Sequence, residues 1–151
     1  MNTPARSLAR SAARLAAVQA LYQHEMEGTH VARLLDEFHQ HRLGREVDEA
    51  GEIAEAEVAF FDDVVSGAIA RRDEVDELLT ARLSEGWSLA RLDKTLLQIL
   101  RCGAYELLAR PDVPVGTAIG EYVDVAHAFF DNRDAKFVNG VLDAVAKAVR
   151  T

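Results

Sequence analysis

Three arginines near the start of the chain recur at every fourth position, at Arg6, Arg10 and Arg14. Four residues of helix rise about 6 Å, which is comparable to the spacing of phosphates along a single strand. A guanidinium group holds a phosphate with two parallel hydrogen bonds. The spacing therefore predicts an electrostatic contact between this end of the chain and RNA.

Tyr22 lies on a neighbouring face of the same helix, beyond Arg14. Its ring could stack on an unpaired base. Packing of the ring inside a helical bundle, with the hydroxyl in water, explains this residue equally well. Three arginines also occur on helices for solubility alone, so a solvated face is the alternative to RNA contact.

The other residue types that carry chemistry form no catalytic or metal-binding pattern. The closest histidines, His39 and His41, would point to different faces of a helix, and no zinc-type spacing occurs. Cys102 lies in a leucine-rich stretch without an adjacent base, which predicts a small buried apolar residue. Acidic pairs such as Asp62 and Asp63 are expected on a solvated face. Glycine-rich phosphate loops and nucleophile motifs are absent. We therefore expect no enzyme, no metal and no cofactor.

The charge of the chain is unevenly distributed. The net charge of the 151 residues is −8, yet residues 1–24 carry +3, residues 25–90 carry −11 and residues 91–151 are neutral. Such a field could orient an anionic ligand toward the N-terminal end and repel it elsewhere. A chance fluctuation of surface charge is the alternative.

Length and composition indicate one compact soluble domain of 151 residues. A single cysteine excludes an internal disulfide bond and favours a reducing compartment. Residues 1–24 are too polar for a signal peptide, and no apolar run approaches the roughly 18 residues that cross a bilayer. We therefore expect a cytoplasmic protein without a membrane segment.

Apolar residues recur at helical spacing along almost the whole chain, which predicts an all-α fold. The predicted helices cover roughly residues 4–27, 30–42, 58–83, 94–110, 114–129 and 135–149, and the third could be one helix or two broken near Arg72. Pro4 and Gly28 bound the first helix, and Asp93 caps the fourth. Residues 43–51 are predicted to form a loop.

The turn at residues 84–86 is the expected boundary between an N-terminal helical subdomain, residues 1–86, and a C-terminal one, residues 87–151, of a single domain spanning residues 1–151. Trp87 is expected to pack at the join. Gly140 is expected to mark a close crossing of two helices.

Apolar side chains at helical spacing also predict which residues face inward. In the first helix Leu8, Leu15, Val18 and Tyr22 share an arc of about 80°, and the three arginines occupy the arc beside it. Phe129 is expected to face inward from the fifth helix. Exposed arginines of this kind would be dispensable for folding, so replacing Arg10 and Arg14 by alanine should leave melting nearly unchanged.

Four segments together resemble the NusB family of transcription antitermination factors. The run ARLAAVQALY at residues 13–22 is similar to the opening helix of that family, and KFVNGVLD at residues 136–143 is similar to its closing motif. Leu100-Arg101 followed by the run AYEL at residues 104–107 resembles the middle signature, and Asp112-Val113-Pro114 the entry to the next helix. Order and spacing agree across nearly the whole chain.

The resemblance implies an all-α fold of two small helical bundles, with about seven helices, and no catalysis. It also implies that the protein pairs with the ribosomal protein NusE, binds the boxA element of nascent ribosomal RNA transcripts, and helps the RNA polymerase antitermination complex to read through terminators. Carried over residue by residue, the RNA-binding set is Arg6, Arg10, Arg14, Gln19, Tyr22, Lys136, Phe137 and Asn139. The alternative is a helical module that forms a homodimer or binds protein without touching RNA.

Overall fold

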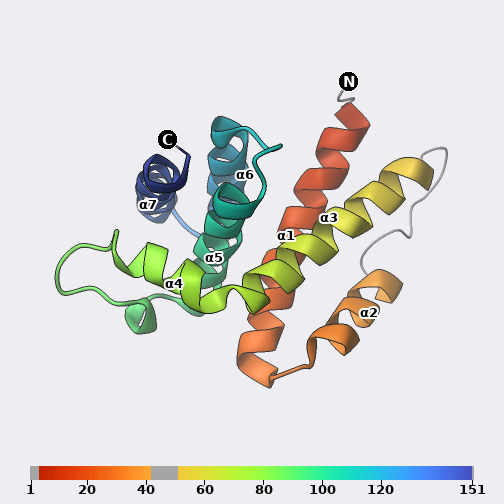
Figure 1. Cartoon of the computed structure of the whole chain (residues 1–151), viewed down its shortest axis with the longest axis horizontal. Coiled ribbons are helices and arrows are strands. Elements are labelled where there is room, and N and C mark those ends of the chain that lie inside the picture. Colours follow the sequence, from red (N-terminus) through yellow and green to blue (C-terminus); the bar gives the residue numbers. More distant parts are fainter. Residues whose placement is uncertain (1–3, 42–50, 151) are drawn as a thin grey trace. The chain divides into compact units, whose positions relative to one another are not determined.

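The computed structural model describes residues 4–41 and 51–150, and the side chains of residues 8–40 and 57–150. Within these ranges regular structure is entirely helical, with seven α-helices and one 3-10 turn (Figure 1). The predicted all-α class with about seven helices is confirmed. The chain divides into two compact units, Met1–Gly67 and Ala68–Thr151.

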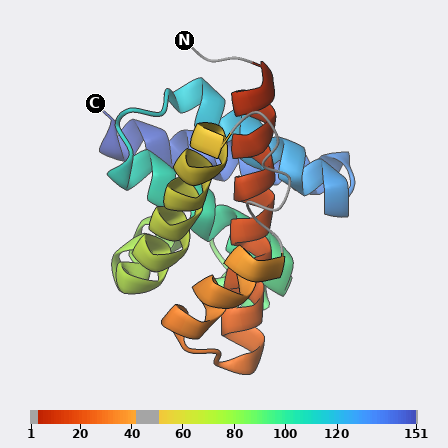
Figure 2. The same cartoon turned by 90° about the vertical axis from the view of Figure 1, so that its right-hand side faces the viewer.

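The first unit contains α1 (Pro4–Glu27), α2 (Val31–His41) and most of α3 (Gly51–Ala70). The predicted bounds of α1 are confirmed, because the helix begins at Pro4 and Gly28 follows it with a φ of 69°, the left-handed conformation that glycine adopts without strain. The chain then turns back, so α2 lies alongside the later part of α1 (Figure 2). Phe38 of α2 stacks on Phe61 of α3 with ring centroids 5.5 Å apart.

The buried face of α1 differs from the predicted one. Leu8 is 71% exposed and Tyr22 is 40% exposed, so the expectation that both face inward is wrong. The buried face is instead formed largely by small residues, namely Ala13, Ala16, Ala17 and Ala20. Helices pack most closely where side chains are small, and the size of an apolar side chain is therefore a poor guide to the face that is buried.

The second unit contains α4 (Arg72–Thr80), the 3-10 turn η1 (Leu89–Arg91), α5 (Lys94–Ala109), α6 (Val115–Phe129) and α7 (Asn132–Val149). Helices α5, α6 and α7 pack against one another, and α4 packs against α5 and α7. The side chain of Asp93 accepts hydrogen bonds from the backbone N–H groups of Thr95 and Leu96, so its predicted capping role is confirmed. Asp131 caps α7 by accepting from the N–H of Asp134.

Helix α5 is buried around its whole circumference from Leu96 to Leu107. Its polar side chains consequently need partners inside the protein. The Nε and Nη2 atoms of Arg101 each donate to Asp76 of α4 at 2.9 Å, and Glu106 accepts a hydrogen bond from the hydroxyl of Tyr122 on α6. Cys102 is fully buried, as predicted, and loss of solvent raises the pKa of its thiol.

Arg150, which follows α7, closes the C-terminal end of α5. Its guanidinium donates to the carbonyl oxygens of Leu107 at 2.7 Å, Arg110 at 2.8 Å, Val113 at 2.9 Å and Glu106 at 3.2 Å. The last carbonyls of a helix have no partner within the helix and carry partial negative charge. One side chain thus satisfies several of these groups and joins α7 to α5.

Three further predictions about the second unit are wrong. Trp87 is 56% exposed, because it lies in the loop between α4 and η1, and Phe129 is exposed at the last position of α6. No heavy atom lies within 4 Å of a Cβ built on Gly140. The close crossing occurs at Gly103 instead, where such a Cβ would lie 2.7 Å from Leu142 Cδ1 on α7.

The division between the two units lies earlier in the sequence than the expected boundary at Gly86. Residues 58–83 form two helices, α3 and α4, with the break at Arg71. Val75 and Leu79 give α4 a buried face, and Asp76 ties the helix to Arg101 of α5. These contacts place α4 in the second unit, so the chain divides at Gly67 and Ala68.

The two glycines should respond oppositely to alanine. Gly140→Ala should raise the free energy of unfolding by about 0.5–1 kcal/mol, because alanine favours the helix and the added methyl meets open space. Gly103→Ala should lower it by about 1 kcal/mol, because the methyl crowds Leu142 and Tyr122. Urea unfolding of both variants tests this, and the opposite signs would contradict the packing described.

Candidate nucleic-acid interface

Arg10 and Arg14 lie on the face of α1 that meets α3. The Nε atom of Arg10 donates to Glu57 Oε2 at 3.1 Å, and its guanidinium lies over the ring of Phe60, 4.2 Å from the centroid. The guanidinium of Arg14 lies 5.0 Å from the centroid of the same ring. The two arginines that spacing places together are indeed together, around one aromatic ring.

These contacts cover the arginines unequally. Arg14 is only 2% exposed, whereas the side chain of Arg10 is 28% exposed. Glu57 is buried as well, and its Oε1 atom has no hydrogen-bond partner. The ring of Phe60 on α3 offsets part of the cost of removing the Arg14 cation from water, so Arg14 does not lie on an open ridge. The side chain of Arg6 lies outside the described residues.

The remaining predicted residues of α1 lie nearer the solvent. Gln19 is partly exposed and makes an interaction of its own within the structure. Tyr22 is exposed over much of its ring. Of the predicted site residues whose side chains are described on α1, Gln19, Tyr22 and part of the Arg10 side chain are accessible to solvent.

The predicted residues near the closing motif belong to the second unit, at the start of α7. Lys136 and Asn139 are exposed, and Phe137 is half-buried. The Asp131 cap fixes where this helix begins and hence where these side chains emerge. Phe137 lines a cavity of about 500 Å³.

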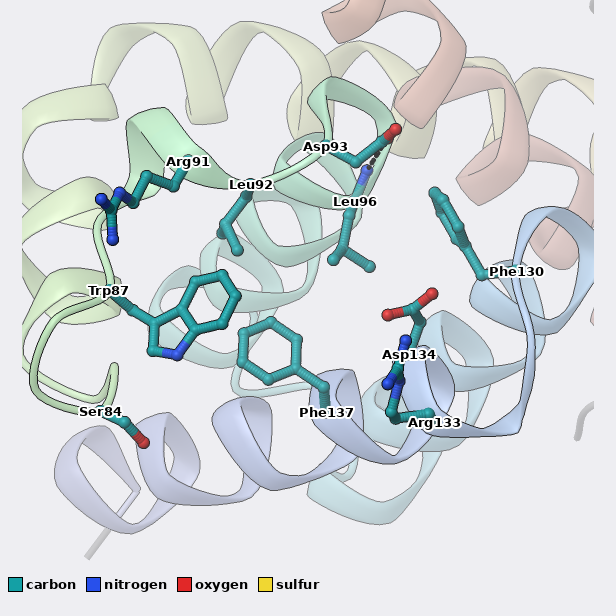
Figure 3. A pocket seen from close by; sticks show the side chains of 10 residues that line it. All are labelled: Ser84, Trp87, Arg91, Leu92, Asp93, Leu96, Phe130, Arg133, Asp134 and Phe137. Carbon is teal, nitrogen blue, oxygen red and sulfur yellow. Dashed lines mark hydrogen bonds between the residues drawn. The ribbon is translucent and has the colours of Figure 1, made fainter.

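This cavity lies between the loop before η1 and the starts of α5 and α7 (Figure 3). The backbone N–H of Trp87 bonds to the carbonyl of Ser84 at 3.0 Å, and Gly86 adopts a φ of 88° at the third position of that turn. Nη1 of Arg91 donates to the carbonyl of Gly86 at 2.8 Å and fixes the turn from the other side. The turn holds the indole of Trp87 at the cavity (Figure 3).

Sequence reasoning missed three residues of this cavity, namely Trp87 as a surface residue, Arg91 and Arg133. The signal for Trp87 was present, because a tryptophan directly after a Ser-Glu-Gly turn stands on a loop and not on a helix face. Arg91 and Arg133 are separated by α5 and α6 in the chain, and only the packing of α7 beside α5 brings them to one cavity.

Within the described residues, no group of three or more histidine, cysteine, aspartate or glutamate side chains could hold a metal ion. None of the described helices combines the length and the apolar character that crossing a membrane requires.

The profile of the NusB family matches residues 11–147 of this chain. The chain is 72% identical to the transcription antitermination protein NusB of Novosphingobium aromaticivorans over 142 residues, covering 94% of this chain and 95% of that protein. It is 63% identical to the NusB protein of Sphingopyxis alaskensis, covering 99% of each.

Two solved structures share the fold. T. maritima NusB matches with a TM-score of 0.77 and 31% identity, covering 97% of this chain and 93% of that one. A second structure is a complex of the antitermination factors NusB and NusE with double-stranded RNA, matched with a TM-score of 0.73 and 26% identity over 93% of this chain and 98% of that one.

Arg14→Ala should destabilise the protein, contrary to the expectation for an exposed arginine. We expect a loss of about 2 kcal/mol in the free energy of unfolding, because the substitution removes a desolvated cation–π contact and the packing of the arginine stem. Arg33→Ala is the matched control, since Arg33 is exposed and pairs with Glu37 on its own helix, and should change stability by less than about 0.5 kcal/mol. Equal melting of the two variants would contradict the buried role of Arg14.

Proposed function

The chain belongs to the NusB family of transcription antitermination factors, and on that premise we propose that it binds the boxA element of nascent ribosomal RNA transcripts together with the ribosomal protein NusE. The complex then helps RNA polymerase to read through terminators. One observation carries the proposal: the fold matches, over 93% of this chain, a structure that contains NusB, NusE and RNA.

Different accessible residues bind the phosphates, the base rings and the base edges of an RNA strand. Lys136 and the exposed part of the Arg10 side chain contact phosphates. Tyr22 and Phe137 offer rings on which unpaired bases stack. Asn139 is exposed on α7 and hydrogen-bonds to the edge of a base.

The other members of the predicted set have different roles. Arg14 is a positioning residue, because it is buried and holds α1 against Phe60 of α3. Gln19 lies beside Tyr22 on the accessible side of α1 and bonds to the strand there. Arg6 contacts phosphate, an assignment that rests on its spacing from Arg10.

The proposed activity is binding without catalysis, in the cytoplasm, where transcripts emerge from RNA polymerase. The support is the chemistry of the accessible residues, which are cations, rings and amides, and the family to which the chain belongs. The most acidic part of the chain, residues 25–90 with a charge of −11, suits a basic ribosomal protein as partner.

A second candidate is self-association through the outer face of α1. Leu8, Tyr22 and Met26 are large exposed side chains at positions that share one side of this helix. A homodimer formed there would cover Tyr22 and compete with RNA. Sedimentation of the free protein, with Leu8→Ser as the comparison, distinguishes a dimer from a monomer.

The proposal is tested by titrating a labelled boxA RNA and a scrambled RNA of the same composition, each with and without NusE. We expect tighter binding of boxA, and the largest difference in the presence of NusE. Equal binding of the two RNAs in both settings would refute the proposal and leave the self-associating module.

Lys136→Ala should weaken RNA binding and make it less dependent on salt. Removal of one phosphate contact to a single strand reduces the slope of log K against log salt by about 0.7. Lys147→Ala is the matched control, because Lys147 is also exposed on α7 and pairs with Asp143. The same slope in both variants would remove Lys136 from the site.

A further inference from the structure

We propose that the cavity lined by Trp87 and Phe137 receives one unpaired RNA base, a role that rests on the RNA binding proposed above. Trp87 is the new element of this site. The cavity lies wholly within the second unit, between the loop that carries Trp87 and the first turns of α7 (Figure 3).

The shape of the site suits a flat heterocycle. Its volume of about 500 Å³ falls in the range of small-ligand sites. The indole of Trp87, from the loop before η1, and the ring of Phe137, from α7, are drawn next to each other at its wall, with Leu92 and Leu96 above them in the view (Figure 3). Unpaired bases stack on such rings whatever their sequence, because every base presents a π-face.

The turn that carries Trp87 keeps its indole exposed. A large indole gains free energy from burial, yet the Ser84–Trp87 turn, the left-handed Gly86 and the bond from Arg91 to the Gly86 carbonyl hold it where 56% stays exposed. A ring fixed in place and open to solvent loses little conformational freedom when a base stacks on it.

The charges around the cavity favour a nucleotide over an apolar peptide side chain. Arg91 and Arg133 place two cations at the cavity, so it is not acidic although Asp93 and Asp134 also line it and the chain has a net charge of −8. Arg133 is the second residue of α7, where a cation opposes the helix dipole, so helix stability does not account for it. A phosphate attached to the base would accept hydrogen bonds from Arg133, whereas an apolar side chain would offer this guanidinium no partner.

One carboxylate at the cavity is also available to the base. Asp93 is engaged in capping α5, through its bonds to the N–H groups of Thr95 and Leu96. Asp134 also lines the cavity, beside Arg133 (Figure 3). Its carboxylate accepts hydrogen bonds from ring or amino N–H groups of a base, which gives the site a preference among bases.

The chain contains one tryptophan, so tryptophan fluorescence reports on this site alone. We would titrate the full chain with unlabelled single-stranded boxA RNA, and with a set of the same RNA in which each position in turn is abasic. Stacking should quench the fluorescence, and one abasic position should abolish the quenching. A parallel anisotropy titration with end-labelled RNA follows total binding.

Trp87→Ala should weaken RNA binding about tenfold, and Trp87→Phe should restore most of the loss because phenylalanine still stacks. Both should melt close to the unsubstituted protein, since the ring is largely exposed. Arg133→Ala should weaken binding about fivefold, with Lys147→Ala unchanged as the control cation on the same helix.

The outcomes separate this inference from the proposed function. RNA binding with unchanged tryptophan fluorescence and full affinity of Trp87→Ala would overturn the inference and leave the function standing. Quenching by NusE but not by RNA would overturn it in favour of a protein contact. Absence of RNA binding by the unsubstituted chain would overturn both.

Discussion

Burying a charged side chain costs several kcal/mol unless a partner lies beside it, and both units are arranged around this constraint. In the first unit, Glu57 and the ring of Phe60 take up Arg10 and Arg14 between α1 and α3. In the second unit, α5 is surrounded on all sides, and Asp76 receives its Arg101 with two hydrogen bonds. Each pair joins two helices, so the need to match charges also fixes which helices pack together.

The same constraint decides which cations remain for a ligand. Arg14, Arg101 and Arg150 are used inside the protein and are unsuited to recognition of RNA. Lys136 and Arg133 stand at the start of α7, where the solvent reaches them. At this end of the second unit, accessible side chains gather where a helix begins, because caps and turns there leave side chains uncovered. The turn that presents Trp87 follows this rule.

Local signals in the sequence predicted the helices well. Pro4, Gly28 and Asp93 act over a few residues, and each bounds its helix as expected. The all-helical class follows from a period that repeats along nearly the whole chain. Such signals need no knowledge of what the helix packs against.

The errors concern partners that lie far along the chain. Arg14 resembled an exposed cation because Phe60, whose ring lies against its guanidinium, belongs to another helix, and the bond from the neighbouring Arg10 to Glu57 spans 47 residues. Gly103 was missed for the same reason, since Leu142 is what makes it necessary. Periodicity places a residue on a face but does not reveal what that face meets. For the RNA-binding set, the resemblance to a family supplied more than spacing did, and only the structure distinguished Arg14 from Lys136.

The position of Arg150 has a consequence for synthesis on the ribosome. All contacts described for the first unit lie between residues that are made early, whereas the carbonyls at the end of α5 wait for a guanidinium that emerges more than forty positions after Leu107 and Glu106. The first unit is thus able to acquire its packing while the rest of the chain is still being translated. The carbonyl groups at the end of α5 cannot receive these hydrogen bonds until Arg150, which follows α7, has left the ribosomal tunnel.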